Sequence, residues 1–305
     1  MTPPRLILTG ATYLVTQRTL RRLFKLRPDA DVKNLILYLL GHAERRFGIV
    51  LHAFQFTSNH FHLVVTDVRR RLPRFMQWFN SLLARAINCY YRESGEFWRR
   101  RSYSAVRLPK SGGAVSEKIV YTLANVTTAG LVESHQDWPG VTSFVGDGAP
   151  VTYRAYKPDF FFSKTNKRWP EFVEFTTRVP EVEGSSPAVV AARIREQVEA
   201  VEAEAREERA RRGLKILGAD GVLKQDRDAS PRNREPWGRI NPRFAGRGAT
   251  YYAMRKAELA FRHSYREAFQ AYCAGRRNTR FPHGTWQMVV LHRAQMLPAT
   301  PGISA

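Results

Sequence analysis

The sequence predicts an α+β fold: a ferredoxin-like antiparallel sheet with helices on one face, followed by a mainly helical C-terminal extension. Apolar runs with strand-like composition occur at residues 5–16, 49–54 and 63–65, and a basic loop that starts at residue 97 leads into a fourth strand over 103–108. Residues 31–47, 72–92 and 116–126 instead repeat apolar side chains with helical spacing. The resulting order is βαββαβ followed by a helix, which is typical of a ferredoxin-like sheet.

The first strand and helix have recognisable boundaries. Residues 5–16 are rich in β-branched and aromatic side chains, and Gly10 predicts a bend. Residues 31–47 place one apolar face of a helix inward, with Asp29 or Asp31 available as its N-cap and Gly48 as its stop.

The next segment predicts a β-hairpin that carries two histidines. Residues 57–59 form a short polar link between two apolar runs, and the second run contains His60 and His62. Side chains alternate along a strand, so both imidazoles point to one face, roughly 6.6 Å apart along the backbone. Two such imidazoles can bind one metal ion. The alternative is a pair of polar residues on a solvated face of the sheet.

The predicted helix 116–126 brings a tyrosine and an amide together. Tyr121 and Asn125 are four residues apart, so they share a helical face. Packed over the histidine face, Asn125 would offer its amide oxygen as a third metal ligand, leaving Tyr121 beside the open coordination positions. A phenol with a pKa near 10 needs a base, a metal or a positive field to act as a nucleophile. Tyr90, Tyr91 and Tyr103 compete for this role, with Tyr90 expected to be buried and Tyr91 to point outward.

Length and periodicity suggest two parts. The 305 residues suffice for one large domain or two. We expect a first domain at 1–148 and a mainly helical, basic extension at 149–305, because residues 150–184 are rich in aromatics and prolines without clear periodicity. Long helices are predicted at 187–212 and 250–274, the first with a narrow apolar seam, and Cys89 and Cys273 are expected to be packing residues.

Composition predicts a polyanionic partner. The chain has 49 Lys and Arg against 27 Asp and Glu, a formal net charge of +22, and such an excess favours nucleic acid. An anionic membrane surface is the rival partner, but no basic amphipathic anchor stands out. No run approaches 18 apolar residues and no signal-peptide pattern opens the chain, so we expect a cytoplasmic protein without membrane contact.

Three linked motifs resemble a known family. Residues 59–65, 95–101 and 121–125 leading to 129–132 are similar in order and spacing to the IS200-type single-tyrosine HUH transposases, and closest to the branch associated with repetitive extragenic palindromes (REPs). The resemblance covers roughly residues 5–145. It implies a single-strand DNA endonuclease and strand transferase that forms a 5′-phosphotyrosine at Tyr121. It also implies Mg²⁺ or Mn²⁺ held by His60, His62 and Asn125, recognition of hairpin DNA, and a homodimer.

The chain departs from the family pattern at three places. Residues 57–59 read Thr-Ser-Asn where members often have Met-Pro-Asn, residues 125–127 read Asn-Val-Thr in place of Asn-Pro-Val, and residues 13–16 read Tyr-Leu-Val-Thr in place of Tyr-His-Val-Thr. None of these removes a proposed catalytic group. Two alternatives stay open: a domesticated, catalytically inactive DNA-binding protein of the same fold, and an HUH nickase of the replication or conjugation type, in which the Tyr90–Tyr91 pair would matter.

A set of basic and aromatic residues suits a groove for phosphates and stacked bases. The alternative for this set is a solvated basic surface. The set comprises Arg69, Arg70, Arg71, Arg74, Phe97, Trp98, Arg99, Arg100 and Arg101.

Overall fold

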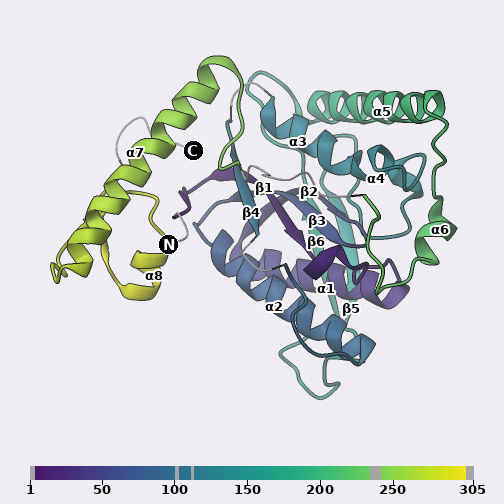
Figure 1. Cartoon of the computed structure of the whole chain (residues 1–305), viewed down its shortest axis with the longest axis horizontal. Coiled ribbons are helices and arrows are strands. Elements are labelled where there is room, and N and C mark those ends of the chain that lie inside the picture. Colours follow the sequence, from purple (N-terminus) through teal and green to yellow (C-terminus); the bar gives the residue numbers. More distant parts are fainter. Residues whose placement is uncertain (1–3, 100–102, 111–112, 234–241, 300–305) are drawn as a thin grey trace.

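The fold is built on one mixed sheet of six strands. The computed structural model describes residues 4–99, 103–110, 113–233 and 242–299. The strand order is β4-β1-β3-β2-β6-β5 (Figure 1). The bounds are β1 (Ala11–Arg18), β2 (Ile49–Phe56), β3 (His60–Asp67), β4 (Ser104–Leu108), β5 (Val151–Tyr156) and β6 (Phe172–Thr177). The α+β fold class is therefore confirmed.

The four strands that the sequence predicts are adjacent in the sheet, with β4 at one edge. β3 pairs antiparallel with both β1 and β2, and β4 pairs antiparallel with β1. Arg18 lies opposite His60, and Thr16 lies opposite His62. β1 starts just after Gly10, whose φ of 71° turns the chain.

Helices α1 (Ala30–Phe47) and α2 (Leu72–Tyr91) cover one face of the sheet (Figure 1). Asp29 occupies the N-cap position of α1, and Gly48, with φ of 64°, ends it. The two helices bury large side chains against the strands, including Phe54, Phe61, Phe75 and Phe79. This face contains most of the hydrophobic core.

The other face is covered by α3 (Ala114–Leu123), α4 (Asn125–Thr128) and the long helix α5 (Pro187–Arg211). Its core joins Val64 of the sheet to Ile119 and Leu123 of α3 and to Ile194 and Val198 of α5. The single helix predicted at 116–126 is interrupted at Ala124, which ends α3 and caps α4. The interruption leaves α4 as a separate helical turn at residues 125–128.

Two strands lie in a region where the sequence analysis expected none. β5 and β6 pair antiparallel, and β6 meets β2 in parallel at Leu51 and Thr177. The sheet thus continues past the predicted domain boundary at residue 148. Val173, Phe175 and Thr177 are buried at alternate positions of β6, but the prolines and aromatics around this short segment obscure its period of two.

The C-terminal part is mainly helical, as expected. It contains α6 (Ala219–Leu223), α7 (Gly248–Cys273) and α8 (Gln287–His292), with the short strands β7 (Arg280–Phe281) and β8 (Gln295–Met296). Two 3₁₀ turns complete the described elements: η1 (Leu20–Arg22) and η2 (His135–Asp137). Cys89 and Cys273 are exposed thiols, so the expectation that they are packing residues is wrong. Within the described ranges, none of the helices has the length and apolarity needed to cross a membrane.

Candidate active site

His60 and His62 lie side by side at the start of β3. Their ring centroids are 4.9 Å apart, and the ring planes are nearly perpendicular at 85°. His62 is buried and His60 is half-buried. The expectation that strand alternation places both imidazoles on one face is confirmed.

Hydrogen bonds orient both rings through Nδ1. Thr16 Oγ1 lies 2.8 Å from His62 Nδ1, while His60 Nδ1 lies 2.6 Å from Asn59 Oδ1 and 2.8 Å from Thr57 Oγ1. A carbonyl oxygen only accepts, so the Asn59 contact favours a proton on His60 Nδ1 and puts the lone pair of the ring on Nε2, where an imidazole can bind a metal ion. This is the usual arrangement of a metal-binding histidine.

Tyr121 lies beside the histidines in the same chain. Its ring centroid is 5.2 Å from that of His62, and its side chain is 44% exposed. Lys118, one turn earlier in α3, places its Nζ 5.4 Å from the centroid of the tyrosine ring. The phenol is thus open to a substrate, close to an imidazole and next to a positive charge.

Asn125 begins α4, and its Oδ1 atom is buried without a hydrogen-bond partner among the residues that the structure describes. An unsatisfied buried acceptor costs about 1–3 kcal/mol, and a cation would remove that cost. Two imidazole nitrogens and an amide oxygen form a mixed donor set that suits a divalent ion such as Mn²⁺; Mg²⁺ would rely more on water and phosphate oxygens. The described residues contain no group of three or more His, Cys, Asp or Glu side chains that could hold a metal.

Gln55 is a neighbour of the site that the sequence analysis missed. It lies directly opposite His62 in the β2–β3 ladder, so both side chains point to the same face. Its side chain is 0% exposed, and neither amide atom has a partner within the described ranges. A glutamine inside the apolar run 49–56 was the available signal. Arg18, which lies opposite His60, was also missed because only the strand register reveals it.

The structure brings only part of the predicted DNA-binding set to the histidine end of the sheet. Trp98 and Thr19 form an isolated antiparallel β-bridge, and Arg99 N donates to Arg18 O at 2.9 Å. Trp98 is half-buried, and its Nε1 donates to Asn80 O at 2.8 Å.

Phe97 is only 6% exposed and belongs to the core, so the expectation that it stacks on bases is wrong. Arg100 and Arg101 lie outside the described residues.

The other predicted arginines follow the far end of β3. Arg69, Arg71 and Arg74 are exposed, but β3 separates them from His60 by roughly 23 Å. Arg70 has a structural role instead. Its guanidinium donates to Ile7 O at 3.0 Å and to Thr285 O at 2.7 Å, which ties the C-terminal segment to the sheet. The expectation that Arg70 binds phosphate is therefore corrected.

One member of the tyrosine pair on α2 is closed to a substrate. Tyr91 is buried, contrary to the expectation, and its hydroxyl donates to Asp29 Oδ2 at 3.3 Å. Burial, together with the charge of Asp29, raises the pKa of the Tyr91 phenol far above 10. Tyr90 is half-buried rather than buried. These contacts count against a nickase that uses this pair.

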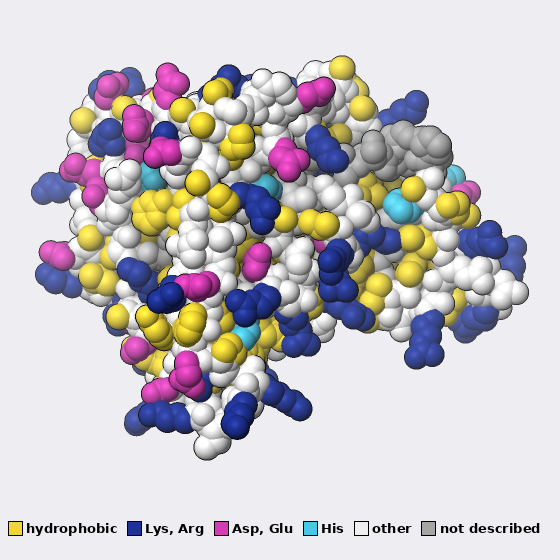
Figure 2. Space-filling view, turned by 180° about the vertical axis from the view of Figure 1, so that it is seen from behind, with side chains coloured by type: hydrophobic (Ala, Val, Ile, Leu, Met, Phe, Trp, Pro, Cys, Tyr) yellow, Lys and Arg dark blue, Asp and Glu magenta, His cyan; other side chains and the backbone are white. Residues whose placement is uncertain are grey.

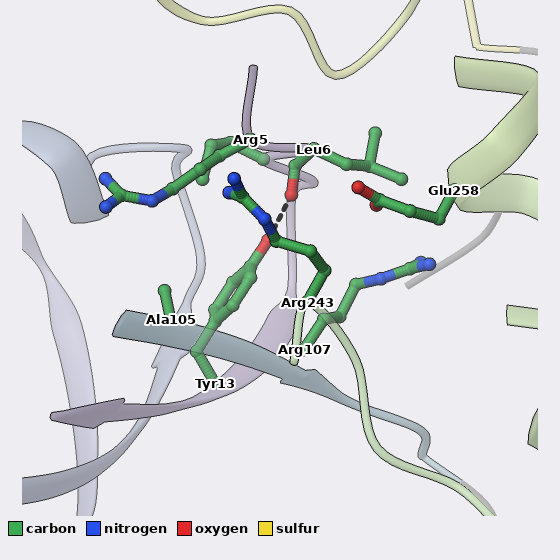
Figure 3. A pocket seen from close by; sticks show the side chains of 8 residues that line it. Arg5, Leu6, Tyr13, Ala105, Arg107, Arg243 and Glu258 are labelled. Carbon is green, nitrogen blue, oxygen red and sulfur yellow. Dashed lines mark hydrogen bonds between the residues drawn. The ribbon is translucent and has the colours of Figure 1, made fainter. Parts of the chain in front are cut away.

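A second polar pocket lies beneath α7 and is separate from the histidine site. It is lined by Arg5, Arg107, Arg243 and Glu258 (Figure 3). Arg107 stands opposite Tyr13, which belongs to the core on the α1–α2 face, away from the histidines. Figure 3 shows the Arg107 and Arg243 side chains on either side of Glu258, and burial lowers the pKa of both guanidinium groups while it raises that of the Glu258 carboxyl. Glu258 belongs to α7 and Arg107 to β4, and neither is part of the candidate site.

Comparison with known proteins gives structural likeness alone. No family model matches the chain, and no curated protein matches it. One similar solved structure is a REP-associated tyrosine transposase bound to a REP hairpin, with 17% identity, a TM-score of 0.40, and coverage of 47% of this chain and 82% of the other. Another is a proposed transposase from Deinococcus radiodurans, with 18% identity, a TM-score of 0.28, and coverage of 35% and 85%. At these values the similarities do not establish a shared function.

Proposed function

We propose that the protein is a transposase of the single-tyrosine HUH type, which cleaves and rejoins single-stranded DNA. The observation that carries the proposal is the proximity of two rings: the centroids of the Tyr121 and His62 rings are 5.2 Å apart, and the His60 ring lies next to that of His62. An accessible phenol beside a pair of oriented imidazoles fits covalent catalysis at a phosphodiester.

The reaction has a simple balance of bonds. The Tyr121 oxygen loses its proton and forms a bond to phosphorus, while the bond between phosphorus and the 3′ oxygen breaks. The 3′ oxygen takes up a proton and leaves as the hydroxyl of the upstream fragment, and the phosphate stays bonded to the 5′ oxygen of the downstream fragment. Attack by a 3′ hydroxyl on this 5′-phosphotyrosine reverses the step and rejoins DNA.

His60, His62 and Asn125 are the residues that would hold a divalent ion, Mn²⁺ or Mg²⁺. Such an ion, when bound, polarises the scissile phosphate and stabilises the charge that builds on its oxygens. Thr16, and Thr57 with Asn59, hold the imidazoles in orientation through Nδ1.

The partner we propose is single-stranded or hairpin DNA. The net charge of +22 favours a polyanion, and Arg18 and Arg99 supply positive charge near the histidines. Arg69, Arg71 and Arg74 would contact DNA farther along the molecule. The proximity of Tyr121 and His62 in one chain supports a site assembled within one subunit, and the expected homodimer stays a prediction.

A covalent-adduct assay tests the proposal. Labelled single-stranded oligonucleotides that span the DNA flanking the gene are incubated with the protein and Mn²⁺, then separated on a denaturing gel. We expect a protease-sensitive band that Tyr121→Phe abolishes. Tyr252→Phe, which changes an exposed tyrosine on α7, is the matched control and should leave the band unchanged. Tight binding without any adduct would instead support the inactive DNA-binding protein.

A further inference from the structure

Helix α5, which belongs to the C-terminal extension, packs on the outer side of the helix that carries Tyr121 (Figure 1). Val190, Ile194 and Val198 of α5 are buried with Ile119 and Leu123 of α3. The seam predicted from the sequence is therefore an interface, and α3 lies between α5 and the sheet. An apolar seam alone fixes the two helices only loosely along their axes, because hydrophobic contact is non-directional.

One buried carboxylate in this interface makes directional contacts. Glu202 of α5 is 3% exposed. Its Oε1 accepts from Thr127 Oγ1 at 2.9 Å and from His135 N at 2.6 Å, and it lies 3.1 Å from His135 Nδ1. Its Oε2 accepts from Ser134 Oγ at 3.1 Å. Burial raises the pKa of this carboxyl, but its bonds to His135 and Thr127 outweigh burial and leave the pKa below its ordinary value.

The end of α5 and the chain that follows it also contact the segment 127–135. Leu217 N and Gly218 N donate to Gly130 O and Leu131 O, each at 3.0 Å. The Arg209 guanidinium lies against Gly130, where a Cβ atom would come within 2.0 Å of its Cζ. Residues 202–218 therefore hold the segment 127–135 at several points, and Glu202 is the only buried charge of α5 among the described residues.

We propose that Glu202 is a positioning residue: through Thr127 and His135 it fixes α4, and so sets the position of Asn125 relative to Tyr121 and the histidine pair. Thr127 is two residues from Asn125 within the four-residue helix α4, so a shift of Thr127 moves Asn125 as well. The inference rests on the proposed function, because it assigns the extension to the same site.

The test compares Glu202→Gln with Glu199→Gln in the full-length protein. Both changes remove one negative charge from α5, but Glu199 is exposed. Mn²⁺ affinity is measured by electron paramagnetic resonance, the adduct rate on gels, and hydrogen exchange by mass spectrometry. For Glu202→Gln we expect Mn²⁺ affinity and the adduct rate to fall by about tenfold or more, as is usual when a residue that orients metal ligands is lost. Exchange should rise in residues 124–135 and stay unchanged in α1, and Glu199→Gln should match the wild type.

Thr127→Val is a second, milder variant that guards against a folding failure, since it removes one donor and keeps the carboxylate bonded to Ser134 and His135. A smaller loss in the same direction is expected. Equal Mn²⁺ affinity and adduct rates in Glu202→Gln and Glu199→Gln would overturn the inference while leaving the proposed function intact. A wild-type protein without adduct or Mn²⁺ binding would contradict the proposed function instead, and faster exchange in α4 of Glu202→Gln would still show that the carboxylate positions that helix.

Discussion

The buried amide of Gln55 lies next to the proposed metal site. A side chain of this kind, without a hydrogen-bond partner in the described part of the chain, lowers stability by about 1–3 kcal/mol. Proteins keep such groups where a ligand uses them. Gln55 is the cross-strand neighbour of His62, so its amide lies on the face of the sheet that carries the proposed metal ligands.

Gln55→Leu should therefore separate stability from metal binding. The change keeps the volume of the side chain and removes the unpaired amide, so we expect the free energy of unfolding to stay equal or to rise by about 1 kcal/mol. Mn²⁺ affinity should fall severalfold. Urea unfolding and electron paramagnetic resonance measure the two quantities, and a variant with unchanged Mn²⁺ affinity would show that Gln55 has no part in the site.

At this scale the sequence predicted some positions but not every environment. Alternation along a strand predicted that His60 and His62 lie together, as their rings do, whereas Tyr121 and Asn125 lie in two helices that meet at Ala124 rather than in one. Phe97 was misjudged because it sits next to a run of arginines, although its own side chain is buried. Arg70 looked like a phosphate ligand because the carbonyl groups that it binds, on Ile7 and Thr285, are far away in the sequence.

At the scale of elements, periodicity predicted long segments better than short ones. The apolar faces of α1 and α5 gave their bounds to within one residue at each end. β6, with six residues, was missed because its pairing with β2 is non-local. The break at Ala124 was missed as well, since no proline or glycine marks it.

The absence of a side chain at Gly41 lets α1 pack closely against β6. It lies in α1 where a Cβ atom would come 2.8 Å from Phe175 Cδ1 and 2.9 Å from Val173 Cγ2. Although alanine favours helices, Gly41→Ala should overpack this contact and lower the free energy of unfolding by about 1–3 kcal/mol. Urea unfolding measures the change, and a more stable variant would contradict the close packing of α1 on β6.

At the scale of the whole molecule, charge is widely distributed. Figure 2 shows Lys and Arg side chains scattered over one face, with acidic groups between them. The net charge of +22 was available from the sequence, but the separation of Arg99 from Arg69, Arg71 and Arg74 by the length of β3 depends on the fold.

Salt dependence can distinguish the arginines proposed to bind DNA from those that stabilise the fold. Each phosphate neutralised on a single strand contributes about 0.7 to the slope of log K against log salt. Arg99→Gln should reduce the slope by about that amount and leave the melting temperature unchanged. Arg70→Gln, the matched control, should lower the melting temperature and keep the slope. Fluorescence anisotropy across a salt series measures the slope. Equal slopes for Arg99→Gln and wild type would show that Arg99 does not contact DNA.

The central claim is that Tyr121 becomes covalently joined to DNA beside the histidine pair. Mass spectrometry of the isolated adduct after nuclease and trypsin digestion tests it most directly, because it names the residue that carries the nucleotide. We expect the added mass on Tyr121, in the tryptic peptide that begins at Ile119. A nucleotide on Tyr90 or Tyr91, or an adduct that persists when His60 and His62 are both changed to alanine, would contradict the account.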